Sequence, residues 1–473
     1  MEEVTPGDVA PRILSRPEHI ISRKNIDPEA LKVLYRLKNH GFVGYLVGGG
    51  VRDLLLGRRP KDFDISTSAH PAQIRKLFRN SFIVGRRFRL VHVRFGRKVV
   101  ETATFRKASE PEAGDTLIRR DNTFGTPEED AFRRDFTVNA LFYDIANFSV
   151  IDWVGGLGDL EARLIRTIGD PAVRLREDPV RMLRAVALAA RLDFRIDSDT
   201  EEAIRFLRGE IVRSSPARIL EEFYKILRQG KSRRTFEMLH EYGLLSYLLP
   251  EADQALGDGG EALLSSLARL DGYRNAGPAD PDTLTNSILT GSLLVPLGAP
   301  LKRMATPTPA WRRREGSREP VENLEEEIQA LGGEDEPEIE LPSRPPPIIL
   351  PFARRDLERL RLMMLAQRKL RAVDAAPSAR QALAGKTYFD EALRWAEIHG
   401  GPEGRDLVEH WRGVEGKPPE PRAAAKPAAK PAAKPAAKPA TKPAADAEAR
   451  PSAGKKRRRR RRRRPGAPSG AGA

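Results

Sequence analysis

The 473-residue sequence contains no cysteine, and no part of it approaches the ~20 consecutive apolar residues that a transmembrane helix needs. The lack of cysteine excludes a disulfide framework and a thiolate metal site. The first twenty residues carry more acidic than basic side chains and lack the apolar run of a signal peptide. The sequence therefore predicts a cytoplasmic protein with no membrane segment, of a length typical of two to four domains.

An excess of positive charge is also lacking over most of the chain. The formal net charge is +16, and residues 416–473 contribute +15 of it through eighteen Lys or Arg against three acids. This segment is a repeated AAKP unit followed by the basic run Lys455–Arg464. Because such a composition cannot bury a core, we expect a disordered basic C-terminal tail.

Hydrophobic patterns divide the remaining chain into an α/β part and a helical part. After residues 1–25, which we expect to be disordered, helix and strand patterns alternate over residues 26–155. Residues 156–230, which we call the neck, and residues 231–415, which we call the body, show helical periodicity. Residues 303–349 are rich in Pro, Glu and Arg without periodicity, which predicts a disordered insert.

The most informative stretch is GGGVRDLLLGRRPKDFDIS, which begins at Gly48. Its glycines, among them Gly48 and Gly49, separate a predicted strand from a short helix, where backbone N–H groups can hold phosphates. KDFDIS alternates as a strand, so Asp62 and Asp64 are expected to face one side. Adjacent carboxylates repel unless a divalent cation lies between them, and oxygen ligands suit Mg²⁺. A lone D-x-D pattern is also typical of a solvated turn.

A two-metal site needs a third carboxylate, and the residues leave two candidates. Glu101 lies in the predicted strand KVVETATF and is placed to join Asp62 and Asp64 from a neighbouring strand. Asp135 opens DFTVNALF, which has a helical pattern, and its alternative role is that of an N-cap. The sequence does not rank the two.

These stretches together resemble the class II nucleotidyltransferases of the polymerase-beta superfamily, which include tRNA CCA-adding enzymes and bacterial poly(A) polymerases. VETATFR, RRDFTVNAL and GDPAVRLREDPVRMLRAVALAARLDF are similar, in this order, to three further motifs of that family. The resemblance covers residues 26–230 strongly and 231–410 weakly. It implies an α/β nucleotidyltransferase head followed by an all-α neck and body.

The resemblance also implies roles for individual residues. Asp62 and Asp64, with Glu101 or Asp135, would hold two Mg²⁺ ions, and ATP would be the substrate. Gly48, Gly49, Arg52 and Arg134 would contact the nucleotide. For Arg52 an ion pair with Asp53 that braces the turn is an equal alternative, and the role of Arg134 beside Asp135 is similarly divided.

The predicted neck helix carries Asp178, Arg181 and Arg184 at positions i, i+3 and i+6. Asp178 and Arg181 would lie on one helix face, where an acceptor and donors can meet the edge of a base. Such a pair would select the incoming nucleotide without a template. A solvated helix with charge pairs is the alternative interpretation.

The stretch SFIVGRRFRLVHVRFG, residues 81–96, resembles the segment that separates bacterial poly(A) polymerases from CCA-adding enzymes. Its Arg86, Arg87 and Arg89 would add positive charge near the head, and His92 is interpreted as a strand residue. We therefore predict a template-independent enzyme that adds AMP from ATP to RNA 3′ ends, with the tail as a non-specific RNA contact. A tail serving only solubility or localisation is the alternative. A CCA-adding enzyme and an inactive, RNA-binding nucleotidyltransferase fold are the rival hypotheses.

Overall fold

The computed structural model describes residues 10–85, 89–108, 123–276, 283–298 and 350–415. The chain divides into two units, Met1–Pro418 and Pro419–Ala473. The predicted insert over 303–349 and the predicted tail over 416–473 lie outside the described residues. In the described part of the chain, no helix has the length and apolar character required to cross a bilayer.

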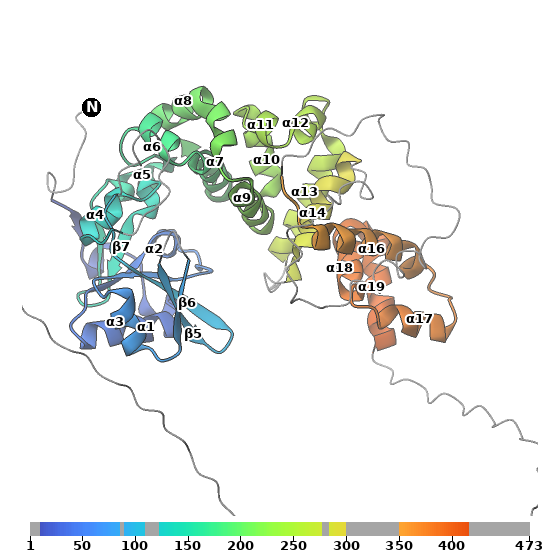
Figure 1. Ribbon diagram of the computed structural model, residues 1–473, viewed down its shortest axis with the longest axis horizontal. Coiled ribbons are helices and arrows are strands. Elements are labelled where there is room, and N and C mark those ends of the chain that lie inside the picture. Colours follow the sequence, from blue (N-terminus) through green and yellow to red (C-terminus); the bar gives the residue numbers. More distant parts are fainter. Residues whose placement is uncertain (1–9, 86–88, 109–122, 277–282, 299–349, 416–473) are drawn as a thin grey trace, which may run out of the picture. The chain divides into compact units, whose positions relative to one another are not determined.

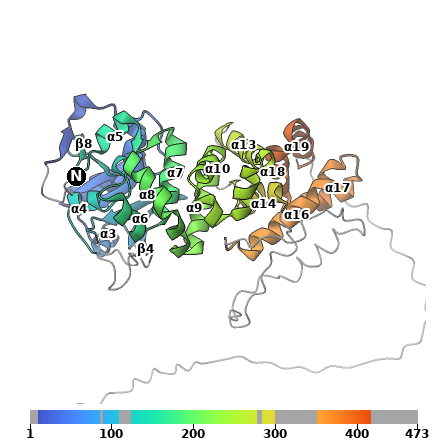
Figure 2. The same cartoon turned by 90° about the horizontal axis from the view of Figure 1, so that it is seen from above.

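An eight-stranded sheet forms the N-terminal part of the first unit (Figures 1 and 2). The strand order is β1-β8-β7-β2-β3-β6-β5-β4, and every pairing is antiparallel except that of β3 with β6. This one parallel pair is joined by a crossover that contains α3, β4 and β5. The strands are β1 (Arg12–Leu14), β2 (Gly44–Val47), β3 (Asp64–Thr67), β4 (Ser81–Val84), β5 (Leu90–Phe95), β6 (Lys98–Thr104), β7 (Leu141–Asp144) and β8 (Ser149–Asp152).

Two helices cover one face of this sheet. Helix α1 (Pro28–Asn39) begins at an Asp27 cap, whose side chain accepts a 2.8 Å hydrogen bond from the Glu29 N–H, and it packs on β2, β3 and β6. Helix α3 (Pro71–Leu77) packs on β4 and β5. Because side chains alternate along a strand, Glu101 and its cross-strand neighbours lie on the opposite face.

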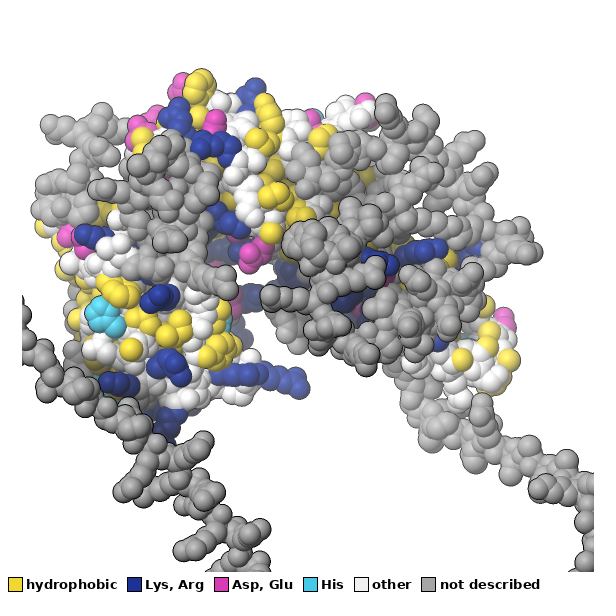
Figure 3. Space-filling view, viewed as in Figure 1, with side chains coloured by type: hydrophobic (Ala, Val, Ile, Leu, Met, Phe, Trp, Pro, Cys, Tyr) yellow, Lys and Arg dark blue, Asp and Glu magenta, His cyan; other side chains and the backbone are white. Residues whose placement is uncertain are grey.

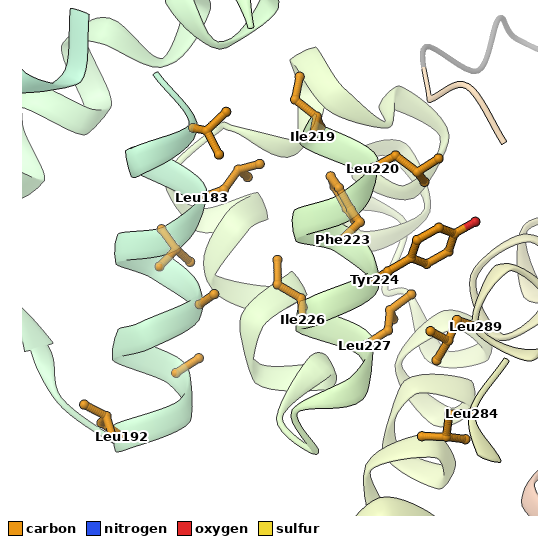
Figure 4. Close-up of a cluster of buried hydrophobic side chains, with 14 of the residues drawn as sticks. Leu183, Leu192, Ile219, Leu220, Phe223, Tyr224, Ile226, Leu227, Leu284 and Leu289 are labelled. Carbon is orange, nitrogen blue, oxygen red and sulfur yellow. The ribbon is translucent and has the colours of Figure 1, made fainter. Parts of the chain in front are cut away.

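The chain beyond the sheet is helical apart from the short strands β9 (Leu164–Ile165) and β10 (Arg195–Ile196). In Figure 4, α7 and α9 bury facing side chains, among them Leu183, Phe223 and Ile226. The ring of Phe223 packs edge-on at 5.6 Å from that of Phe236. The helices are α5 (Gly156–Ala162), α6 (Pro171–Glu177), α7 (Val180–Leu192), α8 (Ser198–Leu207), α9 (Pro216–Arg228), α10 (Ser232–Glu241), α11 (Leu245–Leu248), α12 (Pro250–Gly257), α13 (Glu261–Ala276), α14 (Asn286–Leu294), α16 (Arg354–Arg371), α17 (Pro377–Ala384), α18 (Phe389–His399) and α19 (Gly401–Glu415).

The predicted fold class, an α/β head followed by helices, is confirmed by this element order. The predicted disorder of residues 1–25 is wrong for the segment from β1 onward. Strand β1 pairs with β8, Ile21 is 1% exposed, and the His19 Nε2 lies 2.9 Å from the Phe148 carbonyl oxygen. These contacts come from distant residues, so the local composition of the segment did not reveal them.

The helix expected from Asp135 onward is also absent. Thr137–Asn139 forms one 3-10 turn, and the chain then enters β7, where Phe142 and Tyr143 are buried. Pairing with β2 and β8 determines the conformation of this segment. Local periodicity is overridden here by the sheet that the segment completes.

The predicted neck helix is two helices. Helix α6 ends at Glu177, Asp178 is extended with φ −148° and ψ 86°, and α7 starts at Val180. Pro179 explains the break, because the ring of a proline disfavours the helical conformation in the residue before it. The helical periodicity expected of the neck is confirmed in α7, where an apolar stripe of Val180, Leu183, Val186 and Ala190 is buried.

Replacement of Phe223 by alanine is expected to lower the free energy of unfolding by about 3–5 kcal/mol, because it leaves a cavity between buried helices. The matched control is Phe206→Ala, since Phe206 on α8 is 78% exposed and its loss should change the same quantity by no more than about 0.5 kcal/mol. Urea denaturation followed by circular dichroism measures both. Equal effects of the two variants would contradict the assignment of Phe223 to the core.

Candidate active site

A cavity of about 550 Å³ lies between the sheet and the neck helices. Nine Lys or Arg and five Asp or Glu line it, so its net charge favours an anionic ligand. Figure 3 shows basic side chains (dark blue) over the visible surface of the described residues as well. The charged residues of the cavity are Arg52, Asp64, Glu101, Arg106, Arg133, Arg134, Asp135, Arg174, Asp178, Arg181, Arg184, Arg191, Glu222 and Lys225.

Two carboxylates meet on the sheet at the wall of this cavity. The parallel register pairs Ile65 with Thr102, which places Asp64 beside Glu101 on one face. The Asp64 side chain reaches the cavity, but the surrounding protein limits its hydration. Burial, followed by the negative charge of Glu101, raises the pKa of Asp64 to about 6. These two groups therefore repel each other when both are ionised.

Asp62 was expected in the same strand as Asp64, and this expectation is wrong. Strand β3 begins at Asp64, because its partner β2 ends at Val47 and the chain turns into α2 (Gly49–Leu55) there. The Asp62 side chain is largely exposed, with Oδ2 3.9 Å from Lys61 Nζ. Its negative charge still contributes to the raised pKa of Asp64.

Asp135 occupies a different environment. Its Oδ2 lies 2.6 Å from Nη2 of Arg184, and its Oδ1 accepts hydrogen bonds from the Phe136 N–H and from Asn139. Burial alone would raise its pKa, but the charge of Arg184 and these hydrogen bonds hold the pKa of Asp135 below its usual range. The structure thus brings Glu101 to Asp64, and it brings Asp135 and Arg184 to each other.

The acidic residues of the sheet suit a hard cation. Among the described residues, no group of three or more His, Asp or Glu is arranged to hold a metal without rearrangement. Asp64 and Glu101 nevertheless present neighbouring carboxylates to a polar cavity, and a cation there would offset both the burial and the charge of Glu101 that raise the pKa of Asp64. Carboxylate oxygens are the ligands that Mg²⁺ prefers. The two carboxylates therefore fit Mg²⁺, and the charge of Asp62 also acts on Asp64.

The glycine turn packs directly against two arginines. Gly48 has φ +73°, and its N–H donates to the Leu141 carbonyl over 3.1 Å. A Cβ at Gly48 would lie 3.2 Å from Nη1 of Arg134, and one at Gly49 would lie 3.2 Å from Nη2 of Arg52. Larger residues would therefore displace these guanidinium groups. Gly49 begins α2, so its N–H lacks an acceptor within the helix.

Arg52 forms the ion pair that the sequence left as one of two alternatives. Its Nε and Nη2 lie 2.9 and 2.7 Å from Oδ1 of Asp53, and its Nη1 donates to the side chain of Asn139. Nη2 of Arg191 on α7 also approaches Asp53, at 3.7 Å. Burial lowers the pKa of Arg191 to about 10, so it remains charged at neutral pH. Asp53 therefore links the glycine turn, through Arg52, to the neck, through Arg191.

Asp130 holds Arg133 and Arg134 in place. It was not among the residues expected from the sequence. It is fully buried on α4 (Pro127–Phe132), and it accepts hydrogen bonds from Nε and Nη2 of Arg133 and from Nη2 of Arg134. Although burial opposes this, both arginines hold the pKa of Asp130 below its usual range. The i, i+3 and i+4 spacing of DAFRR was the signal available in the sequence.

The residues expected to select the base are held by partners from two helices, α6 and α9. Asp178 accepts two hydrogen bonds from Arg218 on α9, at 3.0 and 2.9 Å. Arg181 donates to the Arg174 carbonyl at 2.7 Å and to Glu177 at 3.1 Å. Sequence reasoning missed Arg218, since nothing local links it to a residue forty positions earlier.

Arg174 joins the neck to the head. Its Nη2 donates to the carbonyl oxygens of Arg133 and Arg134 at 2.8 and 2.9 Å, and its Nη1 bonds Glu177. Burial, together with the charge of Arg181, lowers the pKa of Arg174 to about 10. The sequence did not point to Arg174, because every residue has a backbone carbonyl. A side chain that binds carbonyls therefore has no recognisable partner residue in the sequence.

The raised pKa of Asp64 predicts a pH dependence of stability in metal-free protein. A carboxyl group with a higher pKa in the folded state stabilises the fold at low pH, and this contribution is lost as pH rises through about 6. Relative to the parent, Asp64→Asn should therefore become more stable as pH increases from 4 to 7. Urea denaturation in EDTA measures this difference, and a pH-independent difference would contradict it. Adding Mg²⁺ at pH 7 should stabilise the parent more than the variant.

Comparison with known proteins agrees with this geometry. Residues 44–166 match the family "Poly A polymerase head domain", and residues 193–256 match "Probable RNA and SrmB-binding site of polymerase A". Poly(A) polymerase I of Salmonella typhi is 50% identical over 264 residues, which are 54% of this chain and 57% of the relative. The chain thus spans a little over half the length of this relative.

Two CCA-adding enzymes are also similar. That of Lactobacillus helveticus is 40% identical over 213 residues, which are 44% of this chain and 52% of the relative. The structure of the Bacillus stearothermophilus CCA-adding enzyme in complex with CTP aligns with a TM-score of 0.54 at 26% identity, over 82% of both chains. The predicted resemblance is confirmed by these matches: residues 44–166 are similar to the head domain of poly A polymerases, and the fold is similar to that of a CCA-adding enzyme.

Proposed function

We propose that this protein is a template-independent adenylyltransferase that adds AMP from ATP to RNA 3′ ends. The observation that carries the proposal is the pair Asp64 and Glu101, which lies in the part of the chain similar to a poly A polymerase head domain and faces an arginine-rich cavity between the sheet and the neck helices. The relatives named poly(A) polymerase I support adenylate addition, since they match at higher identity than the CCA-adding enzymes do.

Asp64 and Glu101, with Asp62, would hold Mg²⁺, which when bound stabilises charge on phosphate oxygens and lowers the pKa of a bound hydroxyl group. In the proposed reaction the RNA 3′ oxygen forms a bond to the α-phosphorus of ATP, and pyrophosphate leaves. Arg134 is fixed beside Gly48 by its bond to Asp130, so its positive charge is oriented before the triphosphate arrives. We assign Glu101, rather than Asp135, as the third carboxylate, because its charge acts on Asp64.

Arg52 and Arg134 carry out separate tasks in this proposal. Arg52 is neutralised in part by Asp53, so it mainly holds the glycine turn in shape. Arg134 lies over the ring of Phe142, with its guanidinium carbon 5.1 Å from the ring centroid, and it presents its charge to the cavity. Asp135 and Arg184 form an ion pair between the head and the neck, and they would position the part of the site that faces the nucleotide sugar.

Base choice would depend on Asp178 and Arg181. Both line the cavity, and bonds to Arg218, Glu177 and the Arg174 carbonyl limit their movement. Side chains restrained in this way discriminate better than mobile ones, because the wrong base leaves their polar groups unpaired. We propose that their arrangement favours adenine. The substrates, ATP and RNA 3′ ends, including those of mRNA, make the cytoplasm the proposed location.

A CCA-adding enzyme is the second candidate, favoured by the alignment with the Bacillus stearothermophilus structure. Purified protein with Mg²⁺ should be given an unstructured RNA, and separately a tRNA that lacks its 3′ end, with each nucleoside triphosphate alone and with all four together. We expect a long ladder on the unstructured RNA with ATP alone. A stop after three nucleotides on tRNA that requires CTP and ATP would contradict the proposal and support the second candidate. No addition to either RNA would support an inactive, RNA-binding fold.

The carboxylate assignment predicts a ranking of variants. Asp64→Asn and Glu101→Gln should each lower kcat by at least about 100-fold, because each removes a group that acts in the transition state. Asp135→Asn should act differently, by weakening the contact with Arg184 and raising the KM for ATP more than it lowers kcat. Single-turnover extension assays with melting curves as a folding control measure these effects. A larger loss of kcat in Asp135→Asn than in Glu101→Gln would reverse the assignment.

A further inference from the structure

A row of side chains extends from the catalytic carboxylates across the sheet to its edge. The antiparallel registers pair Glu101 with His92 and His92 with Phe82. The side chains touch: His92 Nε2 lies 3.4 Å from Glu101 Oε1, and the rings of His92 and Phe82 lie edge to face at 5.4 Å. Because Asp64 stands beside Glu101, the row connects Phe82 to the reacting end of the cavity.

Part of this row is exposed and does not line the cavity. Phe82 is 44% exposed, although its ring contacts that of His92. On the same face, Arg94 and Val99 are register partners, and Val99 is 41% exposed. Helices α1 and α3 cover the opposite face. We call Phe82, His92, Arg94 and Val99 the edge platform.

We propose that the edge platform binds the last few nucleotides of the RNA 3′ end, with one unpaired base stacked on Phe82. This inference rests on the proposed function, since it assigns the path of the RNA that the site extends. Bases stack on exposed aromatic rings whatever their identity, which suits an RNA that is not selected by sequence. Arg94 is exposed, its Nε donates to the Gly96 carbonyl at 3.1 Å, and its positive charge would attract a phosphate.

The spacing of the strands fits such a path. Phe82 and Asp64 are separated by three strand-to-strand steps, or about 14 Å at about 4.8 Å each. Stacked nucleotides rise about 3.4 Å each, so this distance spans at most about four nucleotides. A base on Phe82 would therefore lie a few positions before the 3′ end while the 3′ hydroxyl lies at Asp64 and Glu101.

The neighbouring residue Ile83 provides a matched control. It is 42% exposed, nearly the same as Phe82, but it lies on the other face, since its register partner is the buried Val91. Phe82→Ala and Ile83→Ala remove comparable apolar surface from one strand, so they should affect stability alike. Only Phe82→Ala should affect RNA. Phe82→Trp retains an aromatic face and should restore the parent behaviour, while Phe82→Leu should not.

The test uses the full chain and short oligoadenylate RNAs in which one of the last six nucleotides is replaced by an abasic ribose. In the parent, one abasic position should lower kcat/KM for RNA by about 5- to 150-fold, the range of a lost base–aromatic stack. Phe82→Ala should show a similar loss with intact RNA and no further loss at that position. The KM for ATP should not change.

The outcomes separate this inference from the proposed function. Extension of RNA by the parent, with equal kcat/KM for Phe82→Ala and Ile83→Ala, would overturn the edge platform and leave the polymerase proposal intact. An abasic effect that persists unchanged in Phe82→Ala would also overturn it. If the parent extends no RNA, the proposed function fails and this inference fails with it. A loss of the same size in Phe82→Ala and Ile83→Ala would overturn it too, because it would indicate a general disturbance of strand β4.

Discussion

The parallel pairing of β3 with β6 is the constraint on which the candidate active site depends. It is the one parallel pair among the described strands of the sheet, and it brings Asp64 next to Glu101 although thirty-six residues separate them in sequence. Parallel pairing requires a crossover, which here passes through α3 and the β4–β5 hairpin. The same crossover places His92 beside Glu101 and Phe82 beside His92. One topological feature thus determines both the acid pair and the surface that adjoins it.

A second set of interactions fixes the charged side chains that surround the cavity beside these strands. Buried Asp130 orients Arg133 and Arg134, and Asp53 orients Arg52 and Arg191. A buried carboxylate is costly unless charged partners and hydrogen bonds compensate for its lost hydration. These acids have two or more donors each, so the arginines are fixed without a ligand present. A preorganised cation of this kind stabilises developing negative charge without the cost of reorientation.

Much of this arrangement could be predicted from local sequence. The glycine turn, the Asp64 position, Glu101 as a candidate and the apolar stripe of α7 all follow from short periodic patterns. The failures have a common physical cause. The extent of β3, the strand β7 and the ordered β1 depend on partners far away in sequence, and the break at Asp178 depends on Pro179. Arg174 and Arg218 bind groups that are brought near only by folding, so no spacing rule identifies them.

The contact of Arg174 with the Arg133 and Arg134 carbonyls has a consequence for the accuracy of the proposed reaction. The backbone of Arg181 and Asp178 follows directly from α6, which carries Arg174, so the residues proposed to choose the base share one support with those proposed to hold the phosphates. A poorly fitting base that shifts the neck would therefore also disturb the alignment of the triphosphate. Discrimination would then arise in the rate of bond formation as well as in nucleotide affinity, so that an incorrect nucleotide binds but reacts slowly.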